Sequence, residues 1–106
     1  MHYRLDTSPY SFQVTRAAEA RKDFGKDVQK VDRETGRPQW VVELLAQDSE
    51  RGEVIRVTVA GDQPKVSQGQ SVRFADLEAI PWNNNGKSGV AYRAVSIQPA
   101  QQSRAA

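Results

Sequence analysis

The sequence predicts an all-β domain, a small barrel of about five or six short strands. Apolar residues alternate with polar ones in several short runs, which is the pattern of strands with one buried and one exposed face. Turn signals rich in Gly, Pro, Asn and Asp separate these runs at intervals of roughly 8 to 12 residues, as in small barrels. The 106 residues are enough for one domain.

The N-terminal quarter combines an arm, a strand and an ambiguous segment. Residues 1–9 show no periodicity and are expected to form an N-terminal arm. Residues 10–15 alternate and predict the first strand. Residues 16–27 fit two structures. Their alanines and charges favour a short helix near the N-terminus, whereas Phe24-Gly25 and the lack of an apolar stripe favour an irregular extension of the first hairpin.

The centre of the chain predicts a three-stranded meander. Its most apolar run, 38–47, is rich in the β-branched and aromatic residues that strands favour. Residues 53–59 alternate strictly between apolar and polar, and a weaker strand is expected at 28–31. Short polar turns that end in Gly36 and Gly52 join the three runs, as hairpins require.

The last third predicts the strands that complete the barrel. Alternation resumes over 71–74, and the final strand is expected over 90–97. Between them, residues 83–86 read Asn-Asn-Asn-Gly, a strong hairpin-turn signal. Residues 98–106 are polar and are expected to form a disordered C-terminal tail. The predicted barrel domain therefore comprises residues 10–97.

The composition argues against an enzyme. The chain has no cysteine, and its single histidine is His2, so the sequence offers neither a thiolate metal site nor a cluster of histidine ligands. A histidine at an expected mobile terminus is also a poor member of a Ser-His-Asp triad. We therefore expect no catalytic residue, no cofactor and no metal.

Hydropathy predicts a cytoplasmic protein with no membrane partner. The mean hydropathy is −0.69. No apolar run approaches the length of a membrane span. The N-terminus also lacks the apolar segment of a signal peptide, so the cytoplasm is the expected compartment.

The charge is small in total but uneven along the chain. The formal net charge is +2, yet basic residues outnumber acidic ones about two to one from Val54 onward. Such a bias predicts a surface that faces a polyanion. Scattered charges on a solvated surface would produce the same count, so this alternative stays open.

Aromatic and basic residues on the expected strands predict a nucleic-acid surface. Small barrels that bind single strands stack bases on aromatic rings and contact phosphates with Arg or Lys. The predicted binding residues are Trp40, Arg56, Arg73, Trp82, Lys87, Tyr92 and Arg93. Trp82 and Tyr92 are expected to stack bases and Trp40 is a lesser candidate, although each ring could instead belong to the core. The three arginines would share one sheet surface if their strands are neighbours.

Three segments of the chain resemble a known family. VDRETGRPQWVVELL, EVIRVTVAGDQPKVSQGQSVRFADLEAIPW and GVAYRAVSI are similar to the plasmid replication, integration and excision activators of actinobacteria. The shared features are the turn at 32–36, Pro38 with Trp40, the strand at 54–59, Gln63-Pro64, Phe74 with Leu77, and the Ala-Tyr-Arg-Ala run at 91–94. The region from Val54 also resembles the second half of the gene-five single-stranded-DNA-binding protein of filamentous phages.

These resemblances imply an OB-like barrel from a mobile element, a plasmid or phage, that handles DNA during replication or transfer. They imply a non-catalytic single-stranded-DNA-binding protein, with a homodimer as its assembly. The alternative is a protein-interaction or regulatory adaptor that recruits replication or excision enzymes without binding DNA. The small net charge supports the adaptor, and an exposed edge strand could accept a strand of its partner.

Overall fold

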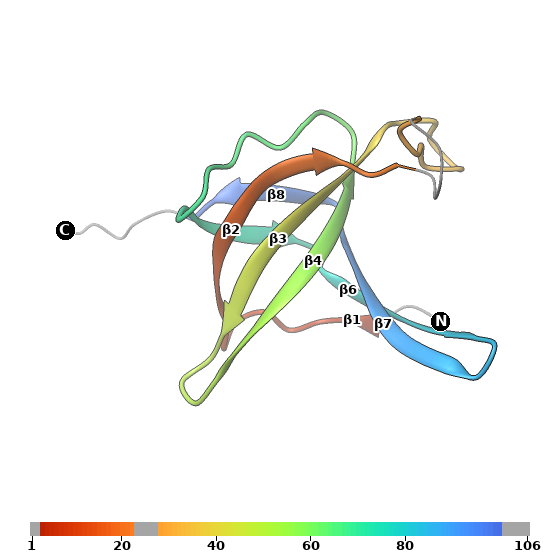
Figure 1. Cartoon of the computed structure of the whole chain (residues 1–106). Coiled ribbons are helices and arrows are strands. Elements are labelled where there is room, and N and C mark those ends of the chain that lie inside the picture. The colour runs from red at the N-terminus through yellow and green to blue at the C-terminus, as the bar shows by residue number, and fades with distance from the viewer. Residues whose placement is uncertain (1–2, 23–27, 101–106) are drawn as a thin grey trace.

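The computed structural model describes residues 3–22 and 28–100, and all regular secondary structure in these residues is β (Figure 1). Eight strands form one sheet that curls into a half-barrel. The strands are β1 (Tyr3–Arg4), β2 (Ser11–Ala20), β3 (Gln39–Gln47), β4 (Gly52–Ala60), β5 (Ser71–Ala75), β6 (Glu78–Asn84), β7 (Lys87–Ala94) and β8 (Ser96–Pro99). The prediction of an all-β fold is confirmed.

The strand order across the sheet is β1-β6-β7-β4-β3-β2-β5-β8. Neighbouring strands are antiparallel except β4 and β7, which run parallel where Val57 to Val59 pair with Tyr92 to Ala94. Val95 alone separates β7 from β8, and β8 pairs with β5 rather than with β4. The chain therefore passes from one side of the curled sheet to the other at this residue.

The meander of β2, β3 and β4 carries most of the core on its concave face. Ile55 and Val57 of β4 are buried, whereas Arg56 between them is exposed, as the alternation of the sequence predicts. The buried core residues are Phe12, Val14, Ala18, Val42, Leu44, Ile55, Val57, Val59, Val66, Val72, Leu77 and Ala94. The opposite, convex face carries polar and charged side chains such as Glu43, Arg56 and Thr58, together with a few apolar ones such as Val41.

The expected helix is not found in the described residues. Residues 16–20 belong to β2, which continues to Ala20 and pairs with β3, while residues 23–27 lie outside the described part. The pairing is irregular, with register shifts on both sides of Arg16. Over the described residues 16–22, the second alternative, an extension of the first hairpin with irregular pairing, is the one observed. Pairing with the apolar β3 overrides the helix propensity of the alanines.

The predicted strand at 28–31 is wrong. Val28 and Val31 are exposed, and the segment makes only isolated bridges, so it lies outside the strands. It belongs to the connection between β2 and β3, and we call the described residues of this connection, 21–22 and 28–38, the β2–β3 loop. Because neither valine packs against the apolar core, the burial that favours β-branched residues in strands is absent here. The third strand of the meander is β2 instead. The other two predicted strands are confirmed as β3 and β4.

The last third contains more strands than predicted. The expected strand at 71–74 is confirmed as β5, whereas the expected final strand is divided into β7 and β8 at Val95. β6 was not predicted because its apolar residues surround Pro81, a residue that normally argues against a strand. The predicted hairpin turn is confirmed. Asn85 and Gly86 have φ angles of 54° and 79°, as a two-residue turn of this hand requires.

Strand pairing extends beyond the predicted domain at both ends. Tyr3 and Arg4, within the expected N-terminal arm, pair with β6. Gln98 and Pro99, within the expected disordered tail, pair with β5 as part of β8. Pairing with an existing sheet edge orders these short segments although they show no periodicity of their own. The rest of the expected tail, 101–106, lies outside the described residues.

Candidate nucleic-acid interface

An open groove of about 680 Å³ lies on the convex face of the sheet, and we call it the outer groove. Its lining residues are Glu19, Ala20, Arg21, Lys22, Lys30, Val41, Arg56, Thr58, Trp82, Val90, Ala91 and Tyr92. β3 and β4 form its floor, the β2–β3 loop forms one wall, and the hairpin of β6 and β7 forms the other. This volume falls within the ~300–1,000 Å³ typical of ligand sites.

Basic side chains gather at the floor and at the β2–β3 wall. Four basic residues against one acidic residue give the lining a formal charge of +3. Nη1 of Arg21 donates a hydrogen bond to Oγ1 of Thr58 at 2.9 Å, which holds this guanidinium group across β3. The backbone N–H of Lys30 donates to the carbonyl oxygen of Arg21 at 2.6 Å and so fixes the loop beside the strand. A concentration of positive charge at one groove attracts polyanions.

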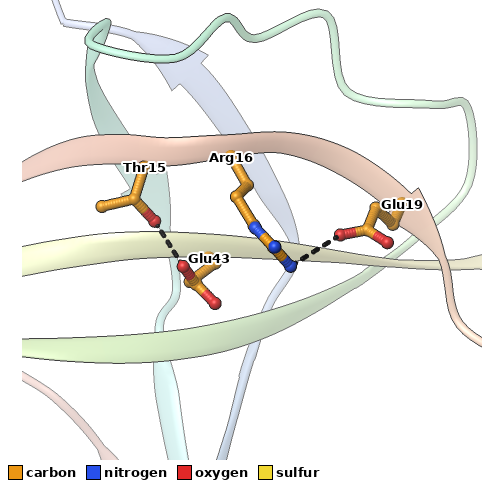
Figure 2. Close-up of polar contacts among 4 residues, drawn as sticks. All are labelled: Thr15, Arg16, Glu19 and Glu43. Atoms are coloured by element: carbon orange, nitrogen blue, oxygen red, sulfur yellow. Dashed lines mark hydrogen bonds and ion pairs between the residues drawn. The ribbon is translucent and has the colours of Figure 1, made fainter.

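Arg56 stands at the floor of the groove. Within the described residues its guanidinium group has no ion pair and no hydrogen bond. Glu43 lies opposite it in the register of β3 and β4, but accepts a hydrogen bond from Oγ1 of Thr15 at 2.8 Å (Figure 2). On the same face, Oε1 of Glu19 lies 3.8 Å from Nη1 of Arg16 (Figure 2). Both carboxylates therefore interact with residues of β2 and not with Arg56, which leaves the guanidinium group of Arg56 available to a ligand.

Trp82 forms the aromatic part of the opposite wall. Its residue opposite on β7 is Gly89, and a Cβ added to Gly89 would lie 2.6 Å from Cζ2 of the indole, closer than real Cβ contacts. The ring therefore rests on the glycine backbone, while 46% of the residue remains exposed. Tyr92 is half-buried and packs against the core, so only part of its ring faces the groove. This wall therefore presents the exposed side of the Trp82 indole to the groove, and packing on Gly89 holds the ring in place.

Two of the predicted site residues, Trp40 and Arg73, do not line the groove. Trp40 is half-buried, and its Nε1 donates a hydrogen bond to the carbonyl oxygen of Gly61 at 2.9 Å, which gives the ring a structural role. Arg73 lies on β5, which β2 and β3 separate from β4. The condition for one shared arginine surface is therefore not met. Nη2 of Arg73 lies 3.5 Å from Oε1 of Gln98.

The other two lie on β7 but outside the groove. Lys87 is exposed at the tip of the β6–β7 hairpin. Nη2 of Arg93 lies 3.4 Å from Oε1 of Glu78, and its surroundings include the carboxylates of Asp32 and Asp76. This negative environment opposes phosphate binding at Arg93. Of the seven predicted residues, the structure thus brings Arg56, Trp82 and Tyr92 together.

Sequence reasoning missed three basic residues of the groove. Arg21, Lys22 and Lys30 all lie in the β2–β3 loop, after the end of β2 at Ala20. Acidic residues interrupt the basic ones in this part of the chain, so the count of charges looked balanced. The density of Lys and Arg over 21–37, in a segment without apolar periodicity, is the signal that could have identified them.

The described part of the chain contains neither a metal-binding cluster nor a membrane-spanning helix. Among these residues, no group of three or more His, Cys, Asp or Glu side chains is placed to hold a metal ion. No helix there has the length and apolar character needed to cross a membrane. No protein-family model, curated protein or solved structure matches this chain.

Proposed function

We propose that this protein is a non-catalytic single-stranded-DNA-binding protein and that the outer groove is its binding site. The observation that carries the proposal is the convergence of basic and aromatic side chains from three separate segments of the chain. Aromatic platforms and a positively charged groove are the two parts that single-strand binding requires.

The barrel is OB-like in this proposal. OB barrels bind oligonucleotides across their second and third strands, between the first loop and the connection that precedes the last strand. In this chain β2, β3, β4 and β5 would be the first four strands of such a barrel, and β7 with β8 would be the fifth. The second and third strands are then β3 and β4. The first loop is the β2–β3 loop, and the connection before the last strand corresponds to the β6–β7 hairpin. The outer groove lies between these four elements, which supports the proposal.

The groove suits a single strand better than a duplex. Bases stack on Trp82 and in part on Tyr92, and phosphates contact the basic floor and the β2–β3 wall. In a duplex the base faces are stacked on one another and cannot reach an indole ring. The two resemblances add the setting, a plasmid or phage replicating or transferring its DNA in the cytoplasm. The likeness to the phage gene-five protein adds a homodimer as the assembly.

The first test is tryptophan fluorescence in a Trp40→Phe variant, where Trp82 is the sole tryptophan. A single-stranded oligonucleotide in about 50 mM salt should quench the emission, and a duplex of the same sequence should not. Quenching by neither nucleic acid would reject the proposal in favour of the adaptor, and equal quenching by both would reject single-strand selectivity.

A comparison of charge reversal inside and outside the groove shows whether binding depends on the groove or only on the net charge of the protein. Replacing both Lys30 and Arg56 with Glu should weaken oligonucleotide binding more than tenfold, because two cations of the groove become anions. Replacing both Arg73 and Lys87 with Glu makes the same change of net charge outside the groove and should alter binding less than twofold. Equal losses in the two variants would show that binding is not localised to the groove. Thermal unfolding of both variants checks that the fold is retained.

A further inference from the structure

β4 and β7 diverge from a short region of parallel pairing. They pair where Val57 to Val59 meet Tyr92 to Ala94, and Figure 1 shows them converging at their C-terminal ends and separating toward their starts. Within the described residues no strand pairs with this edge of β4 over 52–56, nor with the facing edge of β7 over 87–91. Such open edges present backbone N–H and C=O groups to a further strand.

Two grooves with different chemistry lie on the two sides of this gap. On the concave side an inner groove, of about 370 Å³, has a mostly apolar lining that includes Leu5, Tyr10 and Ile55. Val90 and Tyr92 line both the inner and the outer groove. Consecutive residues of β4 also divide between them, since Ile55 lines the inner groove and Arg56 the outer one. A strand in the gap would therefore have an apolar groove on one face and a basic groove on the other.

We propose that the open edge of β4 over 52–56 accepts an extended segment of a partner protein in which apolar and acidic residues alternate. Successive side chains of a strand point to opposite faces. One set would enter the inner groove beside Ile55 and Val90, and the other would face the positive charge of the outer groove. The backbone bonds supply affinity and the alternating side chains supply specificity, as in other cases of strand addition.

The charges of the two grooves fix the order of the alternation. The outer groove carries a formal charge of +3 and favours acidic side chains. The inner groove contains the carboxylates of Asp6 and Glu53, so an acidic side chain on that face is repelled and an apolar one is preferred. This site is separate from the proposed nucleic-acid binding, and its test contains no DNA, so the two proposals can fail independently.

The test uses a synthetic seven-residue peptide of alternating Val and Glu, with an otherwise identical Val and Lys peptide as the control. We expect the Val/Glu peptide to bind the full chain and to slow hydrogen exchange of the β4 amides over 52–56. The Val/Lys peptide should bind at least tenfold more weakly, because its cations meet the basic outer groove. No binding of the Val/Glu peptide at 1 mM, about the weakest affinity worth assigning, or equal binding of both peptides, would overturn the proposal.

Two backbone-methylated peptides test strand pairing while leaving the protein unchanged. N-methylation of every Val removes the N–H donors along one edge of the peptide strand, and N-methylation of every Glu removes those along the other edge. Pairing with β4 uses a single edge, so one methylated peptide should lose at least tenfold in affinity more than the other. If both methylated peptides bind as tightly as the unmethylated one, the peptide does not bind as an added strand. Equal losses in both would show that it pairs with β7 as well, which overturns pairing with β4 alone.

Discussion

Gly89 determines where the Trp82 ring lies. The indole is in contact with the glycine backbone, and a methyl group at position 89 would overlap Cζ2 of the ring. Gly89→Ala should therefore displace the ring from the groove wall and weaken single-strand binding. Stacking on an aromatic side chain contributes ~1–3 kcal/mol per base, so Trp82→Ala should lose about 5- to 150-fold in affinity and Gly89→Ala a part of this. Oligonucleotide titrations of both variants measure the loss.

The double variant Gly89→Ala with Trp82→Ala distinguishes a role of Gly89 in positioning the indole from a general effect on the hairpin. If Gly89 acts through Trp82, then Gly89→Ala should have little further effect once Trp82 is replaced by Ala, because the ring that it positions is gone. Ser88→Ala, on the neighbouring residue of β7, is the control and should bind like the unmodified protein. A full loss from Gly89→Ala in the Trp82→Ala background would show that the glycine serves only the hairpin.

The β3–β4 turn shows how a single carboxylate stabilises an element. Oδ1 of Asp48 accepts hydrogen bonds from the backbone N–H groups of Arg51 at 2.9 Å and Glu50 at 2.8 Å, and these bonds lower the pKa of Asp48 below its ordinary value. A group with a lowered folded-state pKa stabilises the fold fully above its unfolded-state pKa, ~3.9 for Asp. This stabilisation is lost as the pH falls through the folded-state pKa.

The free energy of unfolding should therefore fall as the pH drops below about 4. Asp48→Asn should show a shallower decline, because its side chain has no proton to gain in this range. Asp62→Asn, in the loop after β4 and without such a hydrogen bond in the described residues, should follow the unmodified protein. Urea unfolding between pH 7 and pH 3 measures the three curves, and identical slopes for the Asp48 variant and the unmodified protein would contradict this account.

At the scale of the whole molecule, features set by neighbouring residues could be predicted and features set by distant pairing could not. The two central strands and the turn at Asn85-Gly86 follow from local alternation and turn chemistry. The extension of β2 and the division at Val95 depend on which strands meet, and a single sequence does not state this. The same limit applies to the groove, since Lys30 reaches it only because the β2–β3 loop folds beside the strands.

The positive charge of the molecule is concentrated in the outer groove. The lining of the outer groove carries a formal charge of +3, whereas the whole chain carries +2, so the rest of the chain has no positive excess. The salt dependence of binding should therefore come from the groove alone. Each phosphate neutralised on a single strand contributes ~0.7 to the slope of log affinity against log salt, so four groove cations predict a slope of about −2.8.

Raising the salt from 50 to 200 mM should then weaken binding about 50-fold. Lys30→Ala removes one of these cations and should make the slope less steep by ~0.7, because one fewer counterion is released on binding. Arg73→Ala removes a cation on β5, outside the groove, and should leave the slope unchanged. Oligonucleotide titrations at several salt concentrations measure all three slopes. A slope that responds to Arg73 and not to Lys30 would place the bound strand on the β5 side of the sheet, away from Trp82.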